Sequence, residues 1–204
     1  MDISRIFDVE DMFCNLFVLA GKCEIKKDVF TRSLESHIFC LSIEKRDYSH
    51  AYEMSVLEVF NEALDNCLSS NDYENVVDDY YWVGKCYFYI QSMTHKSFSY
   101  IFLKLPFEKL YKMYNPYHEV DFGNILDMFF EFEKEETIIK LLCKRRNITL
   151  TYVSKKTSIP ISTLRKYRLS DEHLYKASFY YIYLLTNFFV VPETLFLKEI
   201  PQVK

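Results

Sequence analysis

Few side chains in this sequence stand at spacings that could do catalytic or metal chemistry. His118, Glu119 and Asp121 lie close together in the chain and could hold a metal ion or transfer protons. Consecutive residues of a helix do not share a face, however, so capping of a helix by Asp121 is the better interpretation. The other isolated histidines, for which we expect structural or exposed positions, are His37, His95 and His173. We therefore expect neither a catalytic residue nor a metal site.

The cysteines do not form a metal-binding or disulfide framework. They are Cys14, Cys23, Cys40, Cys67, Cys86 and Cys143, and no two of them have the CxxC spacing of a zinc site. The chain begins without a basic segment followed by an apolar one, which would mark a secretion signal. We expect reduced, mostly buried thiols in a cytoplasmic protein that needs no cofactor.

Known enzyme motifs are also missing. The sequence has no Gly-rich phosphate loop, no G-x-S-x-G and no H-E-x-x-H. Arg46 and His50 are similar to the Arg–His pair of HEPN-type ribonucleases, but fewer residues lie between them than in those enzymes. We expect a protein that is not an enzyme, and an enzyme with an unrecognised helical site remains the third hypothesis.

Composition favours a folded, all-α protein. The chain has 204 residues, of which 50% are hydrophobic, and it has only three glycines and five prolines. That apolar content excludes a disordered tail, and so few glycines and prolines leave few turns for a many-stranded β fold. The most apolar stretch, residues 177–191, is shorter than the roughly 20 residues of a membrane span. We expect no membrane partner.

Charge divides the chain near residue 137. Residues 1–137 contain 13 Lys and Arg against 25 Asp and Glu, a balance of −12, whereas residues 138–204 contain 12 against 4, a balance of +8. Such a contrast is typical of a nucleic-acid-binding domain attached to an acidic partner-binding or sensor domain. We predict an acidic helical domain for dimerisation or partner binding over residues 1–137 and a basic domain over residues 138–204.

Apolar residues recur at helical spacing in the acidic part, which predicts a bundle of five to seven helices. The stripes are Leu57, Phe60, Leu64 and Leu68; Val76, Tyr80, Val83, Tyr87 and Ile90; and Phe122, Ile125, Leu126, Phe129 and Phe130. Residues 38–43 are continuously apolar except for Ser42, and we predict a strand there.

The basic part contains a pattern of caps, turns and inward residues. Thr149 can cap a short helix, Ser158 stands at a tight turn, and Ile159 fills the angle before a second helix. Leu164 and Tyr167 lie three apart on the inner side of that second helix. Residues 138–196 resemble, in this order of elements, the lambda-repressor/Cro-like (XRE) helix-turn-helix family.

The resemblance implies a five-helix domain that places the helix around residues 161–167 in the major groove of double-stranded DNA. It implies base-edge contacts from Ser162 and Lys166, and backbone contacts from Arg165 and Lys155. The complete set of expected DNA-binding residues is Thr149, Lys155, Ile161, Ser162, Thr163, Arg165, Lys166, Arg168 and Lys176.

Three positions depart from the family pattern. Leu150 stands where the family commonly has a phosphate-binding Gln, and Cys143 and Arg168 replace an Arg–Glu pair. Because both members of that pair are changed, neither leaves a lone buried charge. Ile161 is apolar at the start of the helix around residues 161–167. It can contact a thymine methyl group, or it can indicate that this face no longer reads DNA.

The acidic part is loosely similar to uncharacterised regions of helix-turn-helix proteins from low-GC bacteria and their mobile elements. The similar segments are residues 82–87, 96–98 and 117–121. The first hypothesis is a homodimeric DNA-binding regulator of transcription, a repressor. The alternative is an antitoxin or anti-CRISPR-type inhibitor, whose acidic domain neutralises a protein partner while the basic domain regulates its own operon.

Overall fold

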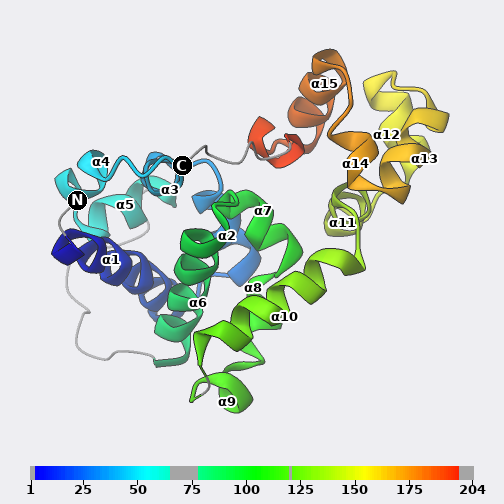
Figure 1. Ribbon diagram of the computed structural model, residues 1–204. Coiled ribbons are helices and arrows are strands. Elements are labelled where there is room, and N and C mark those ends of the chain that lie inside the picture. Colours follow the sequence, from blue (N-terminus) through cyan, green and yellow to red (C-terminus); the bar gives the residue numbers. More distant parts are fainter. Residues whose placement is uncertain (1–2, 65–77, 120, 198–204) are drawn as a thin grey trace. The chain divides into compact units, whose positions relative to one another are not determined.

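The computed structural model describes residues 3–64, 78–119 and 121–197, and within these ranges every regular element is a helix (Figure 1). The predicted all-α fold is confirmed. The chain forms two compact units, residues 1–129 and residues 130–204, which we call the N-terminal unit and the C-terminal unit. The acidic run around residue 133 forms the end of helix α10 (Phe122–Glu135), and the unit boundary lies inside this helix.

Most helices of the N-terminal unit are short. Their bounds are α1 (Ile3–Lys22), α2 (Lys27–Leu34), α3 (Ile38–Glu44), α4 (Ser49–Glu53), α5 (Val56–Ala63), α6 (Asp78–Thr94), α7 (Phe98–Lys104), α8 (Phe107–Tyr111) and α9 (Tyr114–Tyr117). The predicted number of five to seven was therefore too low. Local start signals interrupt the apolar stripes: Ser55 and Ser97 cap α5 and α7, and Pro106 precedes α8.

Helix α3 corrects one prediction, because residues 38–43 form a helix and not a strand. His37 caps its N-terminus: the backbone N–H of Phe39 donates to His37 Nδ1 over 3.2 Å. Phe39, Cys40 and Ile43 are buried, and their spacing places them on one side of a helix. A short apolar run without alternation fits either element, and here the cap decided the outcome.

Helices α1 and α6 form the centre of the N-terminal unit, where aromatic rings fill much of the core. Gly84 of α6 lies against the backbone of α1, and a Cβ atom at this position would stand 2.8 Å from Cys14 Cα. Tyr87 is fully buried, and its hydroxyl donates a hydrogen bond of 2.7 Å to the carbonyl oxygen of Leu105. The glycine thus permits a close helix approach that any other residue would obstruct.

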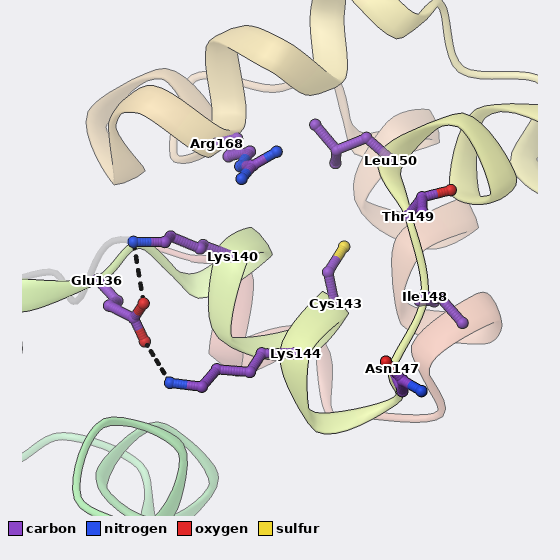
Figure 2. Close-up of a pocket in the computed structure, with 9 residues that line it drawn as sticks. All are labelled: Glu136, Lys140, Cys143, Lys144, Asn147, Ile148, Thr149, Leu150 and Arg168. Carbon is purple, nitrogen blue, oxygen red and sulfur yellow. Dashed lines mark hydrogen bonds and ion pairs between the residues drawn. The ribbon is translucent and has the colours of Figure 1, made fainter.

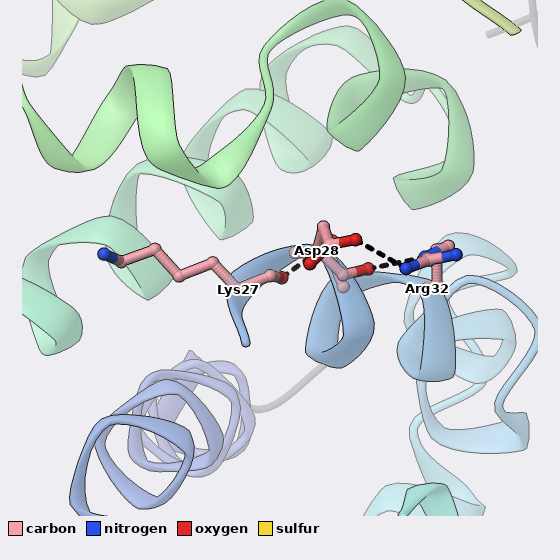
Figure 3. Close-up of polar contacts among 4 residues, drawn as sticks. Lys27, Asp28 and Arg32 are labelled. Atoms are coloured by element: carbon pink, nitrogen blue, oxygen red, sulfur yellow. Dashed lines mark hydrogen bonds and ion pairs between the residues drawn. The ribbon is translucent and has the colours of Figure 1, made fainter. Parts of the chain in front are cut away.

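Polar contacts of α2 complete this unit. Arg32 Nη2 lies 2.5 Å from Asp28 Oδ2 on the exposed side of the helix, one turn away (Figure 3). Lys27 points away from that pair, and its Nζ lies 3.1 Å from Glu108 Oε2 and 4.0 Å from the centre of the Tyr111 ring. Lys27 therefore ties α2 to α8 through an ion pair and a cation–π contact.

The C-terminal unit follows as a series of short helices around its own core. They are α11 (Ile138–Arg145), α12 (Leu150–Thr157), α13 (Ile161–Leu169), α14 (Asp171–Leu174), α15 (Phe179–Phe189) and the 3-10 helix η1 (Glu193–Phe196). Helix α12 packs against α13 and α15, and α11 packs against α13. Their buried side chains include Leu142, Val153, Ile159, Leu164, Leu185, Phe189 and Phe196.

Arg146 closes this core at the end of α15. Its guanidinium donates to the carbonyl oxygens of Phe188, over 2.9 Å, and of Phe189, over 2.5 Å. These carbonyls belong to the last turn of α15, where a cation also complements the helix dipole.

In the described residues, no helix is long and apolar enough to cross a membrane.

Candidate nucleic-acid interface

The turn between α12 and α13 is fixed by local hydrogen bonds. Ser158 has a left-handed backbone with a φ of 59°, which is uncommon for a residue with a side chain. The N–H of Ile159 donates to Thr157 Oγ1 over 3.3 Å, and Ser154 Oγ donates to the Ile159 carbonyl over 2.6 Å. Ile159 itself is fully buried. These contacts fix the start of α13 relative to the end of α12.

Thr149 begins α12 as the sequence predicts. Its hydroxyl accepts a hydrogen bond of 3.2 Å from the N–H of Tyr152, so the predicted capping role is confirmed. The side chain of Thr149 is exposed. The first turn of α12 therefore presents a positive helix end at the surface of the unit.

Helix α13 has one buried and one exposed side. Leu164 and Tyr167 face the core, whereas Ser162, Arg165 and Lys166 are exposed. The exposed three lie on one side of the helix because they are spaced three and four apart. They have the access to solvent that contact with a nucleic acid would require.

Not all predicted contact residues are equally accessible. Ile161 and Thr163 are half-buried, because the first turn of α13 lies partly against the unit. Three further predicted residues are exposed: Lys155 in α12, Arg168 near the end of α13, and Lys176. Lys156, the neighbour of Lys155 in α12, is exposed as well. Among the residues that the structure describes, no carboxylate forms a salt bridge with any of these four or with Arg165 and Lys166.

We call the exposed part of this set the α12–α13 surface: Thr149, Lys155, Lys156, Ser162, Arg165, Lys166 and Arg168. It contains five cationic side chains and no anionic one. Exposed cations without anionic partners keep their full charge available for an incoming phosphate. The charge of this surface is chemically suited to a polyanion.

A pocket that the sequence did not predict lies in the same unit. It has a volume of about 470 Å³ and is formed by Glu136 and one side of α11, the α11–α12 connection, the start of α12 and the end of α13 (Figure 2). Glu136 lies at its edge, with one oxygen 2.9 Å from Lys140 Nζ and the other 3.5 Å from Lys144 Nζ. The bond from Lys140 and the two positive charges lower the pKa of Glu136.

Cys143 and Arg168 both line this pocket. Burial raises the pKa of the Cys143 thiol, and the charge of Arg168 opposes that rise. The backbone near Arg168 is held in place, because Thr137 Oγ1 donates to the Arg168 carbonyl over 2.9 Å. Asp171 supports the same corner by accepting a bond of 2.8 Å from the N–H of Ile138.

Sequence reasoning missed the pocket because its wall comes from separate elements. One signal was available: Glu136, Lys140 and Lys144 are spaced four apart, which favours ion pairs along one helix face. No comparable signal indicates that this face lies beside the end of α13.

Two polar side chains of the N-terminal unit, Arg46 and Asp121, form the following contacts. The Arg46 guanidinium lies 2.8 to 2.9 Å from the ring nitrogens of His95, a residue distant in sequence. Partial burial, and after it the charge of Arg46, lower the pKa of His95. Asp121 Oδ1 accepts a bond of 2.7 Å from the N–H of Gly123, as expected of a helix cap. Within the described ranges, no three ligand-type side chains group as a metal site.

Comparison with known protein families, with curated proteins and with solved structures found no match to this chain.

Proposed function

We propose that the chain is a DNA-binding regulator of transcription, a repressor, that reads the major groove with α13. The observation that carries this proposal is the α12–α13 surface. Two exposed cations of α12 and three of α13 lie on it, and no carboxylate of the described residues forms a salt bridge with them. An exposed helix of this length can enter a major groove, and the flanking cations can bind the phosphates on either side.

The proposal assigns two kinds of contact to Ser162, Arg165 and Lys166 of α13. Ser162 and Lys166 contact base edges, because both lie on the exposed side of α13. Arg165, together with Lys155 at the end of α12, binds phosphates and positions the helix. The capped N-terminus of α12 at Thr149 faces a further phosphate.

A homodimer is part of the proposal, since two copies place two such helices in successive major grooves. Helix α15 offers a surface for this contact. Phe179, Tyr180 and Tyr183 are 70%, 64% and 51% exposed, and exposed apolar side chains gathered on one helix are typical of interaction sites. Light scattering of the full chain, alone and with Tyr183→Glu, tests this part: the variant is expected to shift the mass from dimer to monomer.

The test of DNA binding uses the full chain and a random duplex library. Repeated selection is expected to enrich one sequence family, and anisotropy titrations of the enriched duplex are expected to weaken steeply with salt. Each neutralised phosphate contributes a slope of about −0.9 in the logarithm of affinity against the logarithm of salt concentration. Lys134→Ala is the matched control, because Lys134 is exposed on α10 and paired with Glu131. No enrichment together with a flat salt response would refute the proposal.

The second candidate is inhibition of a basic protein by the acidic part of the chain. Its supporting observation is charge: the N-terminal unit, residues 1–129, has 12 Lys and Arg against 21 Asp and Glu. Such a surface complements a basic nucleic-acid-binding cleft. Co-purification from the native host at low salt is expected to yield a stoichiometric basic partner that high salt releases, and recovery of the chain alone would count against it.

A further inference from the structure

The pocket of the C-terminal unit has the size and charge of a ligand site. Its volume of about 470 Å³ lies in the range of small-molecule sites and far exceeds a single phosphate group. Lys140, Lys144 and Arg168 line it, against the single carboxylate of Glu136. An anionic ligand would therefore meet a net positive wall.

The cations of the pocket differ in their availability. Both lysines are engaged by Glu136, whereas the Arg168 guanidinium forms no salt bridge within the described residues. Arg168 is also the group whose charge reaches the half-buried Cys143 thiol. In Figure 2, Arg168 lies above Lys140 on a separate helix, and the Lys140 ammonium is directed toward Glu136.

The rest of the lining is suited to an apolar group. Leu150, Ile148 and Cys143 are half-buried and line the pocket, and Figure 2 shows Leu150 and Cys143 pointing into the space beside Arg168. Burial raises the pKa of Cys143, so at neutral pH its thiol is uncharged and offers a soft, weakly polar surface.

We propose that this pocket binds a small organic anion, with its phosphate or carboxylate group at Arg168 and Lys140 and its apolar part against Leu150, Ile148 and Cys143. The proposal adds a regulatory step and in that respect rests on the proposed function. Thr149 and Arg168 belong both to the pocket and to the α12–α13 surface, so ligand and DNA compete for them. A bound anion releases the protein from DNA.

Calorimetry with the full chain and phenyl phosphate tests the binding step without DNA. Phenyl phosphate is expected to bind at least tenfold more tightly than inorganic phosphate, because only the former fills the apolar part. Arg168→Gln and Lys140→Gln are each expected to lower its affinity at least tenfold. The matched control is Arg145→Gln, which removes a charge from α11 outside the pocket lining and is expected to leave the affinity within twofold.

A second readout locates the ligand. Alkylation of Cys143 by N-ethylmaleimide, followed by peptide mass spectrometry, is expected to slow at least fivefold in phenyl phosphate, whereas alkylation of Cys23 in the N-terminal unit stays unchanged. Absence of calorimetric binding, equal affinity in the Arg168→Gln variant, or unprotected Cys143 would each overturn the pocket assignment.

DNA competition separates this inference from the proposed function. With the selected duplex, phenyl phosphate is expected to weaken DNA binding by the unmodified chain but not by Leu150→Trp, which fills the pocket. If phenyl phosphate binds and no duplex is selected, the ligand site stands and the proposed function fails. If a duplex is bound and phenyl phosphate does not weaken its binding, the regulatory step fails.

Discussion

Ser154 donates a hydrogen bond of 2.6 Å from its hydroxyl to the carbonyl oxygen of Ile159, across the turn that joins α12 to α13. The bond connects α12, which contains Ser154, to Ile159, which lies two residues before the start of α13. It satisfies a carbonyl beside the left-handed Ser158, where the backbone cannot continue the helical pattern. The orientation of α13 thus depends on a side chain that does not touch its exposed surface.

Ser154→Ala is expected to lower the free energy of unfolding by about 1 kcal/mol, because the Ile159 carbonyl loses its hydrogen bond. Urea denaturation measures this loss. The matched control is Ser162→Ala, which removes an exposed hydroxyl from α13 and is expected to change the stability by less than about 0.5 kcal/mol. Equal stability of the Ser154 variant and the unmodified chain would contradict the role of this bond.

Lys166→Ala and Arg165→Ala are expected to affect DNA binding differently. Loss of a base-edge contact at Lys166 is expected to cost about 1 to 3 kcal/mol on the selected duplex and to relax the preference at one base pair. Loss of a phosphate contact at Arg165 is expected to weaken all duplexes alike and to reduce the salt slope by about 1. Anisotropy titrations with matched single-base variants distinguish the two, and exchanged or identical patterns would refute the assigned roles.

Gly84→Ala is expected to destabilise the N-terminal unit by about 1 to 3 kcal/mol, since the new methyl group would overlap the Cys14 backbone of α1. The higher helix propensity of alanine, about 1 kcal/mol, opposes this loss only in part. Thermal unfolding measures the net effect. Lys85→Ala, at the next and exposed position of α6, is the control and should leave the transition nearly unchanged.

His37 makes the stability of α3 dependent on pH. Burial lowers the pKa of His37 below its ordinary value of about 6.5, and the nearby Glu62 carboxylate only partly opposes this. The unfolded chain therefore binds a proton first as the pH falls. The cap contributes fully above pH of about 6.5, and its contribution is lost as the pH falls through the lower pKa of the folded state.

The His37→Asn variant isolates this effect, because asparagine caps a helix and does not titrate. Denaturant unfolding across pH 4 to 8 is expected to show a smaller stability loss at acid pH for the variant than for the unmodified chain. Identical pH profiles would rule out the titration of His37 as a source of instability.

Local sequence patterns predicted the positions of several residues in the C-terminal unit. Thr149, Ser158 and Leu164 were each assigned from sequence to a cap, a turn and an inner face, and each occupies that position. The strand predicted for residues 38–43 was wrong, because a short and almost continuous apolar run contains no clear periodicity. Histidine is also an uncommon helix cap, so His37 gave no clear signal of a helix start.

The candidate site was only partly predictable. Exposure of Ser162, Arg165 and Lys166 follows from helical spacing once the inner residues are identified. The pocket does not follow, because the proximity of Cys143 to Arg168 depends on how α11 packs against α13. Helix packing is set by many small side-chain fits, which no local pattern contains.

Arg146 has a consequence for the order in which the C-terminal unit matures. It stands at the end of α11, yet its hydrogen-bond acceptors, the carbonyl oxygens of Phe188 and Phe189, lie in α15 and are synthesised after α12, α13 and α14. During synthesis, α11 to α14 emerge from the ribosome before the hydrogen bonds between Arg146 and α15 can form. In a nascent chain, α13 therefore lies in an incomplete core until α15 has been translated.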